Sequence, residues 1–309
     1  MVTATTEYAT LAGERFRDEN TMALGALAER VSVPAKRVAV DATAHPGRRI
    51  VAGRYHVRTL LGTGGMGVVW LAHDEVLQRP VAVKQFRSDQ RDDASCALRE
   101  ARAAARVAHP NVVRVHDVVL DDDGDWLVME ALPGESLLTI IGERGRLPVE
   151  EVRQIARQLL SALQAIHAVD LVHRDVKPGN IQLCGDRVVL TDFGLSAPAY
   201  AGGGSRGPAA GSLRYMAPET IMDGQFGPPS DLYSLGATLY AAVEGHPPFD
   251  PGTQMSLPDP ARPAALAPPK HAADLRELLR GLLECDPVRR MDVAGALSHL
   301  RMTSRSPQN

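Results

Sequence analysis

Apolar residues change their spacing near residue 132 of this 309-residue chain. Before that point they gather in short runs rich in Val and Leu, which are typical of β-strands. These runs are Tyr55–Leu61, Val68–Ala72, Val81–Phe86, Val112–Val119 and Trp126–Met129. After residue 132 the spacing predicts helices over Val152–Ala168, Leu232–Glu244 and Asp274–Glu284. A small β-rich part followed by a larger helical part predicts an α+β chain of two lobes with a cleft between them.

One helical pattern and one turn interrupt the strand-like part. A helical pattern covers Ala94–Ala108, and the acidic turn Asp121–Asp125 separates the last two strand runs. We therefore expect a first lobe over residues 50–132, a second lobe over 133–303 and a short tail over 304–309.

Residues 1–49 differ from the rest of the chain. Their apolar side chains give a weak amphipathic pattern, which Pro34 and Pro46 break. A mobile extension is the simplest interpretation. A docking or regulatory helix, and translation that begins at Met22, stay open as alternatives.

Charge and cysteine content exclude several classes of protein. The formal net charge is −3, which argues against bulk binding to nucleic acid or acidic membranes. Three widely separated cysteines without a CxxC pair argue against a disulfide framework or a zinc site. We find neither a signal peptide nor a run of about 18 apolar residues. We therefore expect a cytoplasmic protein without a membrane span.

Glycines punctuate the run Gly62-Thr63-Gly64-Gly65-Met66-Gly67. Glycines at this spacing let the backbone lie close to phosphates, because no side chain intervenes. Dinucleotide-binding folds use a similar pattern, but they require a helix to open at the glycines. Here the strand-like run Val68–Ala72 follows, so the glycines cap a hairpin and favour a lid over ATP. Taken alone, an ordinary glycine-rich turn is the simpler interpretation.

A lysine ends the next apolar run of the chain. Lys84 closes the run Val81-Ala82-Val83-Lys84, and a strand-end lysine usually faces solvent. Glu100 changes that expectation, because it is the only acidic residue of the predicted helix Ala94–Ala108. A glutamate there can hold the lysine against the α- and β-phosphates of ATP.

The run His173-Arg174-Asp175-Val176-Lys177-Pro178-Gly179-Asn180 is the most specific motif. It matches the catalytic-loop pattern HRDxKxxN, and here the chain resembles the protein kinase superfamily. Asp175 suits a carboxylate that accepts or orients a substrate hydroxyl proton, and Asn180 supplies an amide oxygen for a magnesium ion. Lys177 would meet the transferring phosphoryl group as a positive charge, and a lysine at this place is associated with serine/threonine specificity.

Two further tripeptides extend the resemblance. Asp192-Phe193-Gly194 follows the apolar strand Val188–Leu190 and matches the DFG element, which implies that Asp192 holds magnesium. Ala217-Pro218-Glu219 matches the end of an activation segment. The resemblance implies that Glu219 pairs with Arg290.

Motif order and spacing agree with the superfamily over about residues 50–301, and the chain is most similar to the eukaryotic-like serine/threonine kinases of bacteria. The resemblance implies a bilobed protein kinase fold that uses ATP and Mg²⁺, with Mn²⁺ as a substitute. Asp231 would open the helix Leu232–Glu244 and hold the backbone of the catalytic loop. Met129 would be the gatekeeper, and the backbone of Glu130 and Leu132 would bind adenine.

The implied site residues fall into three groups. The catalytic group is Asp175, Lys177, Lys84 and Glu100. The nucleotide-binding group is Leu61, Gly62, Gly64, Gly67, Val69, Ala82, Lys84, Met129, Glu130, Leu132 and Asn180. The metal ligands are Asn180 and Asp192.

The activation segment departs from the usual pattern, because Asp192–Glu219 contains no threonine. Kinases with an arginine before the catalytic aspartate often need a phosphate on this segment. Ser205 is our hypothesis for an autophosphorylation site, with Ser196 and Tyr200 as weaker candidates, and a loop that needs no phosphate is the alternative. Ser212 takes the place of a threonine that contacts substrate.

Six prolines in Asp250–Lys270 also suggest that a substrate-docking helix is shortened or missing. The sequence thus predicts a serine/threonine protein kinase that acts on protein hydroxyls, with possible homodimers for autophosphorylation. A pseudokinase or nucleotide-binding scaffold is the main alternative, and a small-molecule kinase is the third.

Overall fold

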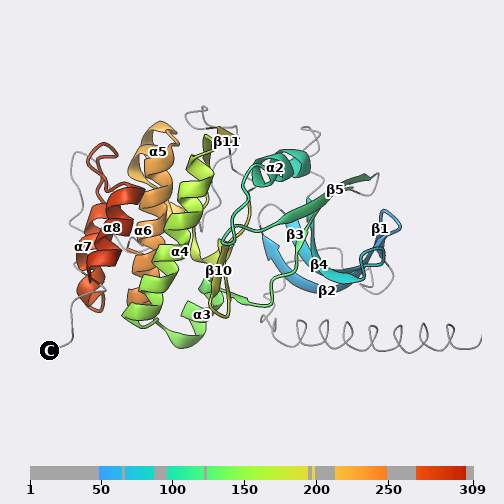
Figure 1. Ribbon diagram of the computed structural model, residues 1–309, viewed down its shortest axis with the longest axis horizontal. Helices are drawn as coiled ribbons and strands as arrows, with labels where there is room; N and C mark the ends of the chain where they lie inside the picture. The colour runs from blue at the N-terminus through green and yellow to red at the C-terminus, as the bar shows by residue number, and fades with distance from the viewer. Residues whose placement is uncertain are drawn as a thin grey trace, which may run out of the picture. The chain divides into compact units, whose positions relative to one another are not determined.

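The computed structural model describes residues 49–64, 67–86, 96–121, 124–193, 197–198, 213–248 and 269–303 (Figure 1). They form two compact units. The first takes in the described residues up to Leu98 together with Val115–Gly134. The second takes in Arg99–Arg114 together with the described residues from Glu135 onward. The predicted extension, apart from Arg49, and the predicted tail lie outside the described residues.

The first unit is built on a six-stranded sheet in which every neighbouring pair is antiparallel. The strand order is β1-β2-β3-β4-β6-β5. The strands are β1 (Ile50–Val51), β2 (Tyr55–Gly64), β3 (Gly67–Asp74), β4 (Arg79–Phe86), β5 (Val115–Asp121) and β6 (Gly124–Glu130). The predicted glycine-capped hairpin is confirmed, because β2 and β3 pair as far as Gly64 and Gly67.

The two faces of this sheet differ, because successive side chains of a strand point to opposite sides. One face carries a buried apolar cluster that includes Val83, Trp126 and Val128. The other face carries Lys84 and its cross-strand neighbours. The hydrophobic cluster therefore fixes the register, because a slip of one residue would exchange the two faces.

The second unit consists mainly of helices, with two small sheets. Its helices are α3 (Leu137–Arg144), α4 (Val149–His167), α5 (Pro218–Asp223), α6 (Pro228–Glu244), α7 (Arg276–Leu282) and α8 (Val293–Thr303). The short 3₁₀ helices are η3 (Pro178–Asn180), η4 (Leu213–Tyr215) and η5 (Ala273–Leu275). The small sheets join β7 (Glu135–Ser136), β9 (Ile181–Cys184) and β10 (Arg187–Leu190), and β8 (Leu171–Val172) with β11 (Ala197–Pro198). Helix α2 (Cys96–Ala105) crosses the boundary between the units in sequence.

Helix α6 is the centre of the second unit. Its side chains from Ser230 to Val243 are buried on all sides, which is the property of a helix inside a core. It packs against α4 and α7, and α8 packs against both of these helices (Figure 1). The predicted buried face of α4 is confirmed, because Val152, Ile155, Leu159, Leu163 and Ile166 are at most 2% exposed.

Several predicted boundaries were wrong. The predicted strand Val112–Val119 is split: Val112 bridges Leu190 of the second unit, whereas β5 of the first unit begins at Val115. The central helix begins at Pro228 rather than Leu232, because proline is tolerated in the first turn of a helix. Asp231 therefore lies inside α6.

The other differences concern ends of elements. The predicted helix over 274–284 is η5 followed by α7, which ends at Leu282, and the helix over 94–108 ends at Ala105. Residues 94–95 and most of the proline-rich segment 250–270 lie outside the described residues. Within the described ranges, no helix is both long and apolar enough to cross a bilayer.

One motif glycine should be required for folding. A Cβ atom on Gly67 would lie 2.1 Å from the backbone oxygen of Gln85, whereas one on Gly62 would meet nothing within 4 Å. We therefore predict that Gly67→Ala lowers the free energy of unfolding by about 1–3 kcal/mol, because β3 must move away from β4. Urea denaturation of Gly67→Ala and of the matched control Gly62→Ala measures the difference. Equal midpoints for the two variants would contradict the prediction.

Candidate active site

The backbone of the loop after β8 is held by one buried carboxylate. Asp231, which is 1% exposed, accepts the backbone N–H groups of His173 and Arg174, each at 2.8 Å. Its Oδ2 atom also lies 2.8 Å from Nε2 of His167, at the end of α4. Hydrogen bonds to a charged acceptor are stronger than those between neutral groups. The predicted role of Asp231 in holding this loop is confirmed.

Two residues of the predicted motifs have left-handed backbone conformations. Arg174 has φ of 71° and Asp192 has φ of 68°. Such conformations are costly for residues other than glycine, and they persist only where surrounding contacts impose them. The hydrogen bond from the Arg174 backbone to Asp231 is one such contact.

His173 joins this loop to the segment around Asp192. Its ring is fully buried and lies edge-on to Phe193, with 5.0 Å between the ring centroids. Nε2 lies 3.1 Å from the backbone oxygen of Thr191, and Nδ1 accepts the backbone N–H of Asp175 at 3.3 Å. These partners require a proton on Nε2 and none on Nδ1. Burial lowers the pKa of His173, although the carboxylates of Asp231, Asp175 and Asp192 oppose this shift.

The two oxygens of Asp175 have different surroundings. Oδ2 accepts hydrogen bonds from Nζ of Lys177 at 2.6 Å and from Nδ2 of Asn180 at 2.9 Å. Within the described part of the chain, Oδ1 has no hydrogen-bond partner. The side chain is only 3% exposed, so the carboxylate is held in one orientation with one oxygen available as an acceptor.

The two polar atoms of the Asn180 side chain also differ in their hydrogen bonds. Its Nδ2 atom donates to both the backbone oxygen and Oδ2 of Asp175, at 2.9 Å each. The amide oxygen accepts no hydrogen bond from the residues that the structure describes. The Asn180 backbone oxygen accepts the backbone N–H of Thr191 at 2.9 Å, which brings Asn180 next to the segment of Asp192 in the fold.

The predicted nucleotide-binding residues of the first unit gather on one face of its sheet. Val69 pairs with Lys84, and Ala82 pairs with Met129. Cross-strand partners share a face, and so do residues two apart on a strand. These four side chains therefore lie opposite the apolar cluster. Lys84 is 4% exposed, and its Nζ lies 5.0 Å from the centroid of the Phe86 ring.

The remaining predicted residues of the first unit lie at element ends. Leu61, Gly62 and Gly64 are in the last residues of β2, Glu130 ends β6, and Leu132 follows it. Glu100 is a buried residue of α2, at 3% exposure. Because Lys84 and Glu100 belong to different units, their pairing stays a prediction. Gly194 and the candidates Ser196, Tyr200, Ser205 and Ser212 lie outside the described residues.

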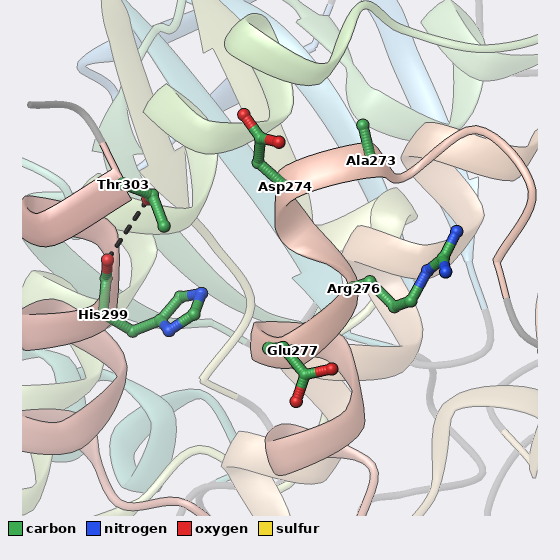
Figure 2. A pocket seen from close by; sticks show the side chains of 6 residues that line it. All are labelled: Ala273, Asp274, Arg276, Glu277, His299 and Thr303. Atoms are coloured by element: carbon green, nitrogen blue, oxygen red, sulfur yellow. Dashed lines mark hydrogen bonds between the residues drawn. The ribbon is translucent and has the colours of Figure 1, made fainter. Parts of the chain in front are cut away.

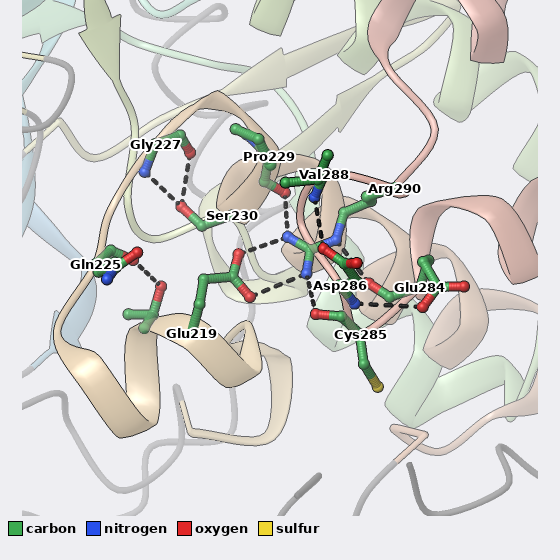
Figure 3. Close-up of polar contacts among 11 residues, drawn as sticks. Glu219, Gln225, Gly227, Pro229, Ser230, Glu284, Cys285, Asp286, Val288 and Arg290 are labelled. Atoms are coloured by element: carbon green, nitrogen blue, oxygen red, sulfur yellow. Dashed lines mark hydrogen bonds and ion pairs between the residues drawn. The ribbon is translucent and has the colours of Figure 1, made fainter. Parts of the chain in front are cut away.

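The predicted ion pair between Glu219 and Arg290 is confirmed. The guanidinium donates to both carboxylate oxygens, at 2.6 and 2.9 Å, and the arginine side chain is 0% exposed (Figure 3). It also donates to the backbone oxygens of Pro229, Glu284 and Cys285. The pair fixes the start of α5 to the segment that precedes α8.

A separate hollow of the second unit contains none of the predicted site residues. It is lined by Ala273, Asp274, Arg276, Glu277, His299 and Thr303 (Figure 2). Its lining includes two carboxylates and one guanidinium.

Sequence reasoning missed two residues of the site region. His167 contacts Asp231 as described above, and the ring of Phe226 lies 4.6 Å from the guanidinium carbon of Arg174. Neither lies in one of the motifs, so only the folded arrangement could reveal them.

Comparison with known proteins decides the family. The sequence profile of the family described as Protein kinase domain matches residues 55–301. This chain belongs to the protein kinase family. The kinase domain is 36% identical to serine/threonine-protein kinase PknA of Mycobacterium tuberculosis over 274 residues, which cover 84% of this chain and 64% of PknA.

Two further relatives agree with this assignment. Serine/threonine-protein kinase PknA of Corynebacterium glutamicum is 34% identical over 84% of this chain and 59% of the relative. PknL of Mycobacterium tuberculosis is 38% identical over 67% of this chain and 53% of the relative. The chain thus spans about three fifths of the length of these curated relatives. The bilobed α+β kinase fold predicted from the sequence is confirmed.

Replacing the Asp231 carboxylate with an amide should destabilise the protein. In Asp231→Asn, an NH₂ group would replace one of the oxygens that accept the N–H groups of His173 and Arg174. We predict that the free energy of unfolding falls by about 1–3 kcal/mol, the usual cost of an unsatisfied buried donor. Urea denaturation measures this loss, with Asp223→Asn, at an exposed position of α5, as the matched control. A loss no larger than that of the control would show that the loop does not depend on Asp231.

The buried histidine predicts a pH dependence of stability. Unfolded His173 binds a proton near its ordinary pKa of 6.5, whereas burial lowers the pKa in the folded kinase domain. The contribution of neutral His173 to the free energy of unfolding is therefore complete above pH 6.5, and it is lost as the pH falls towards the folded-state pKa. We expect the free energy of unfolding to fall by up to about 1.4 kcal/mol per pH unit from this residue. Denaturation of the wild type and of His173→Gln at several pH values tests this, and identical slopes would refute it.

Proposed function

We propose that this chain is a serine/threonine protein kinase that transfers the γ-phosphoryl group of ATP to protein hydroxyls. The observation that carries this proposal is the asymmetry of Asp175. Lys177 and Asn180 hold its Oδ2 atom, and Oδ1 accepts no hydrogen bond within the described residues. A carboxylate with one fixed and one available oxygen suits the orientation of an incoming hydroxyl.

The charges around Asp175 support the same reaction. Lys177 lies against Asp175, where a positive charge can meet the phosphoryl group as it moves to the acceptor. We propose that Lys84 of the first unit binds the phosphates and, as the family resemblance implies, that Glu100 of α2 holds Lys84 in place. Positioning and charge stabilisation account for most of the catalysis of phosphoryl transfer, so these groups need no covalent role.

The available oxygens fit a magnesium ion. Mg²⁺ prefers hard oxygen ligands and is usually bound through one or two carboxylates together with substrate phosphates. The amide oxygen of Asn180 accepts no hydrogen bond from the described residues, and Asp192 follows Thr191, which is bonded to the Asn180 backbone. We propose that Asn180 and Asp192 hold the metal, and Mn²⁺ suits the same ligands. When bound, the ion neutralises charge on the β- and γ-phosphates.

The nucleotide itself suits the first unit. We propose that Leu61, Val69, Ala82 and Met129 line the adenine site and that the backbone of Glu130 and Leu132 binds its edge. A Cβ atom on Gly62 or Gly64 would meet nothing within 4 Å, which leaves room for phosphates near the backbone. Gly67 is part of the same loop, although its lack of a side chain is already explained by the backbone of Gln85.

The proposal also covers the division of the chain into lobes, its substrates and its location. We propose lobes over residues 50–132 and 133–303, with an extension over 1–49 and a tail over 304–309. Protein substrates with serine or threonine acceptors, a cytoplasmic location and homodimers for autophosphorylation complete the proposal. Ser205 remains our candidate for that modification, because Arg174 of the second unit is half-buried and carries a positive charge.

A phosphotransfer assay with labelled ATP, Mg²⁺ and a generic protein acceptor tests the proposed activity. We expect Asp175→Asn to lower the rate by about 10²–10⁴-fold, because the available carboxylate oxygen is lost. Lys84→Met and Asp192→Asn should be similarly inactive and still folded. Asp186→Asn, at an exposed turn between β9 and β10, is the matched control and should retain activity.

The outcomes separate the alternatives. A wild type that binds nucleotide without any transfer would indicate a pseudokinase, and transfer to small molecules alone would indicate a different substrate class. Near-normal transfer by Asp175→Asn or Asp192→Asn would contradict the proposed roles.

A further inference from the structure

An aromatic ring lies against the arginine that precedes Asp175. The guanidinium carbon of Arg174 is 4.6 Å from the centroid of the Phe226 ring, within the range of a cation–π contact. Phe226 and Arg174 are far apart in sequence, and both belong to the second unit. The contact therefore joins the loop of Asp175 to the segment between α5 and α6.

The segment that carries Phe226 is held at both sides. Before the ring, the Thr220 hydroxyl donates to the backbone oxygen of Gln225 at 2.8 Å, and the Gln225 N–H donates to the backbone oxygen of Glu219. After the ring, the hydroxyl of Ser230 donates to the backbone oxygen of Gly227 and accepts its N–H (Figure 3).

The ion pair with Arg290 adds a further fixed point. It holds the side chain of Glu219 at the start of α5 (Figure 3). The ring is thus presented to Arg174 from a short segment whose ends have little freedom.

The surroundings of Arg174 favour such a contact. Its backbone has left-handed φ and is bound to Asp231, while its side chain is half-buried. Burial lowers the pKa of the guanidinium, which means that the site penalises its charge, and Asp231 opposes this shift. The face of an aromatic ring attracts a cation, and this attraction strengthens where water is excluded.

We propose that Phe226 is a positioning residue that acts through Arg174: its ring holds the guanidinium, and so keeps the neighbouring Asp175 oriented for phosphoryl transfer. The role in transfer rests on the proposed function. The support does not require a phosphate, which matters in a chain whose segment Asp192–Glu219 contains no threonine. Phe226 touches neither the acceptor nor the nucleotide in this scheme.

The contact is tested first by stability, without reference to activity. Unfolding midpoints are measured for the full chain, for Phe226→Leu, for Arg174→Met and for the double variant. We expect Phe226→Leu to lower the midpoint in the wild type and to lower it by less than half as much in Arg174→Met. Equal losses in the two backgrounds would show that ring and guanidinium do not interact, and would overturn the inference.

The role in transfer is tested by kinetics on protein treated with phosphatase, so that no phosphate on the activation segment contributes. We expect Phe226→Leu to lower kcat about tenfold with an unchanged KM for ATP. Phe226→Tyr keeps the ring and should restore most of the rate. Met222→Ala, an exposed position on α5, controls for a general disturbance of the region.

The two kinds of failure are distinguishable. A wild type without transfer overturns the proposed function and with it the kinetic role, while the stability measurements still decide whether the contact exists. An active wild type whose kcat is unaffected by Phe226→Leu overturns the positioning role. So does a fall in kcat of the same size in the Arg174→Met background, because the ring would then act independently of the arginine.

Discussion

The second unit depends on one carboxylate placed inside a hydrophobic helix. Asp231 is in the first turn of α6, whose other side chains are nearly all buried, and its two oxygens accept the backbone of His173 and Arg174. An unpaired charge in such a place would be strongly destabilising. The loop therefore supplies two N–H donors to the carboxylate, and the carboxylate holds Arg174 in a left-handed conformation that is costly for this residue. His173 and Asn180 are in turn bonded to Asp175, so their positions depend on the same loop backbone.

The motifs pointed to polar residues that the structure brings together, since Lys177 and Asn180 both contact Asp175. The roles of Asp231 and of the Glu219–Arg290 pair followed from the family resemblance, and both contacts are present. Most strands of the first unit were likewise predicted from short apolar runs bounded by glycine or acidic turns, although β1 was missed and β5 begins later than expected. Much of the fold could thus be read from local pattern and motif order.

What could not be predicted depended on contacts between distant residues. The run from Val112 to Val119 contains no glycine or proline that would divide it, yet Val112 bridges Leu190 while β5 starts at Val115. No local propensity specifies that division, because the partner strands decide it. The early start of α6 was hidden by Pro228 and Pro229, which break a helix in its middle but not in its first turn. The contact of Phe226 could not be predicted for the same reason, since its partner Arg174 lies about fifty residues earlier in the chain.

The glycines of the β2–β3 hairpin have different reasons to be glycine. At position 67 any side chain would collide with the neighbouring strand, whereas a Cβ at position 62 or 64 would meet nothing within 4 Å. Natural selection would therefore preserve the first even in a descendant that no longer bound the proposed nucleotide, because the sheet needs it. The other two would be free to drift in such a lineage. Among relatives of this chain, a glycine kept at position 67 alone would record ancestry of the fold, and only the set of three would record continued use of the loop.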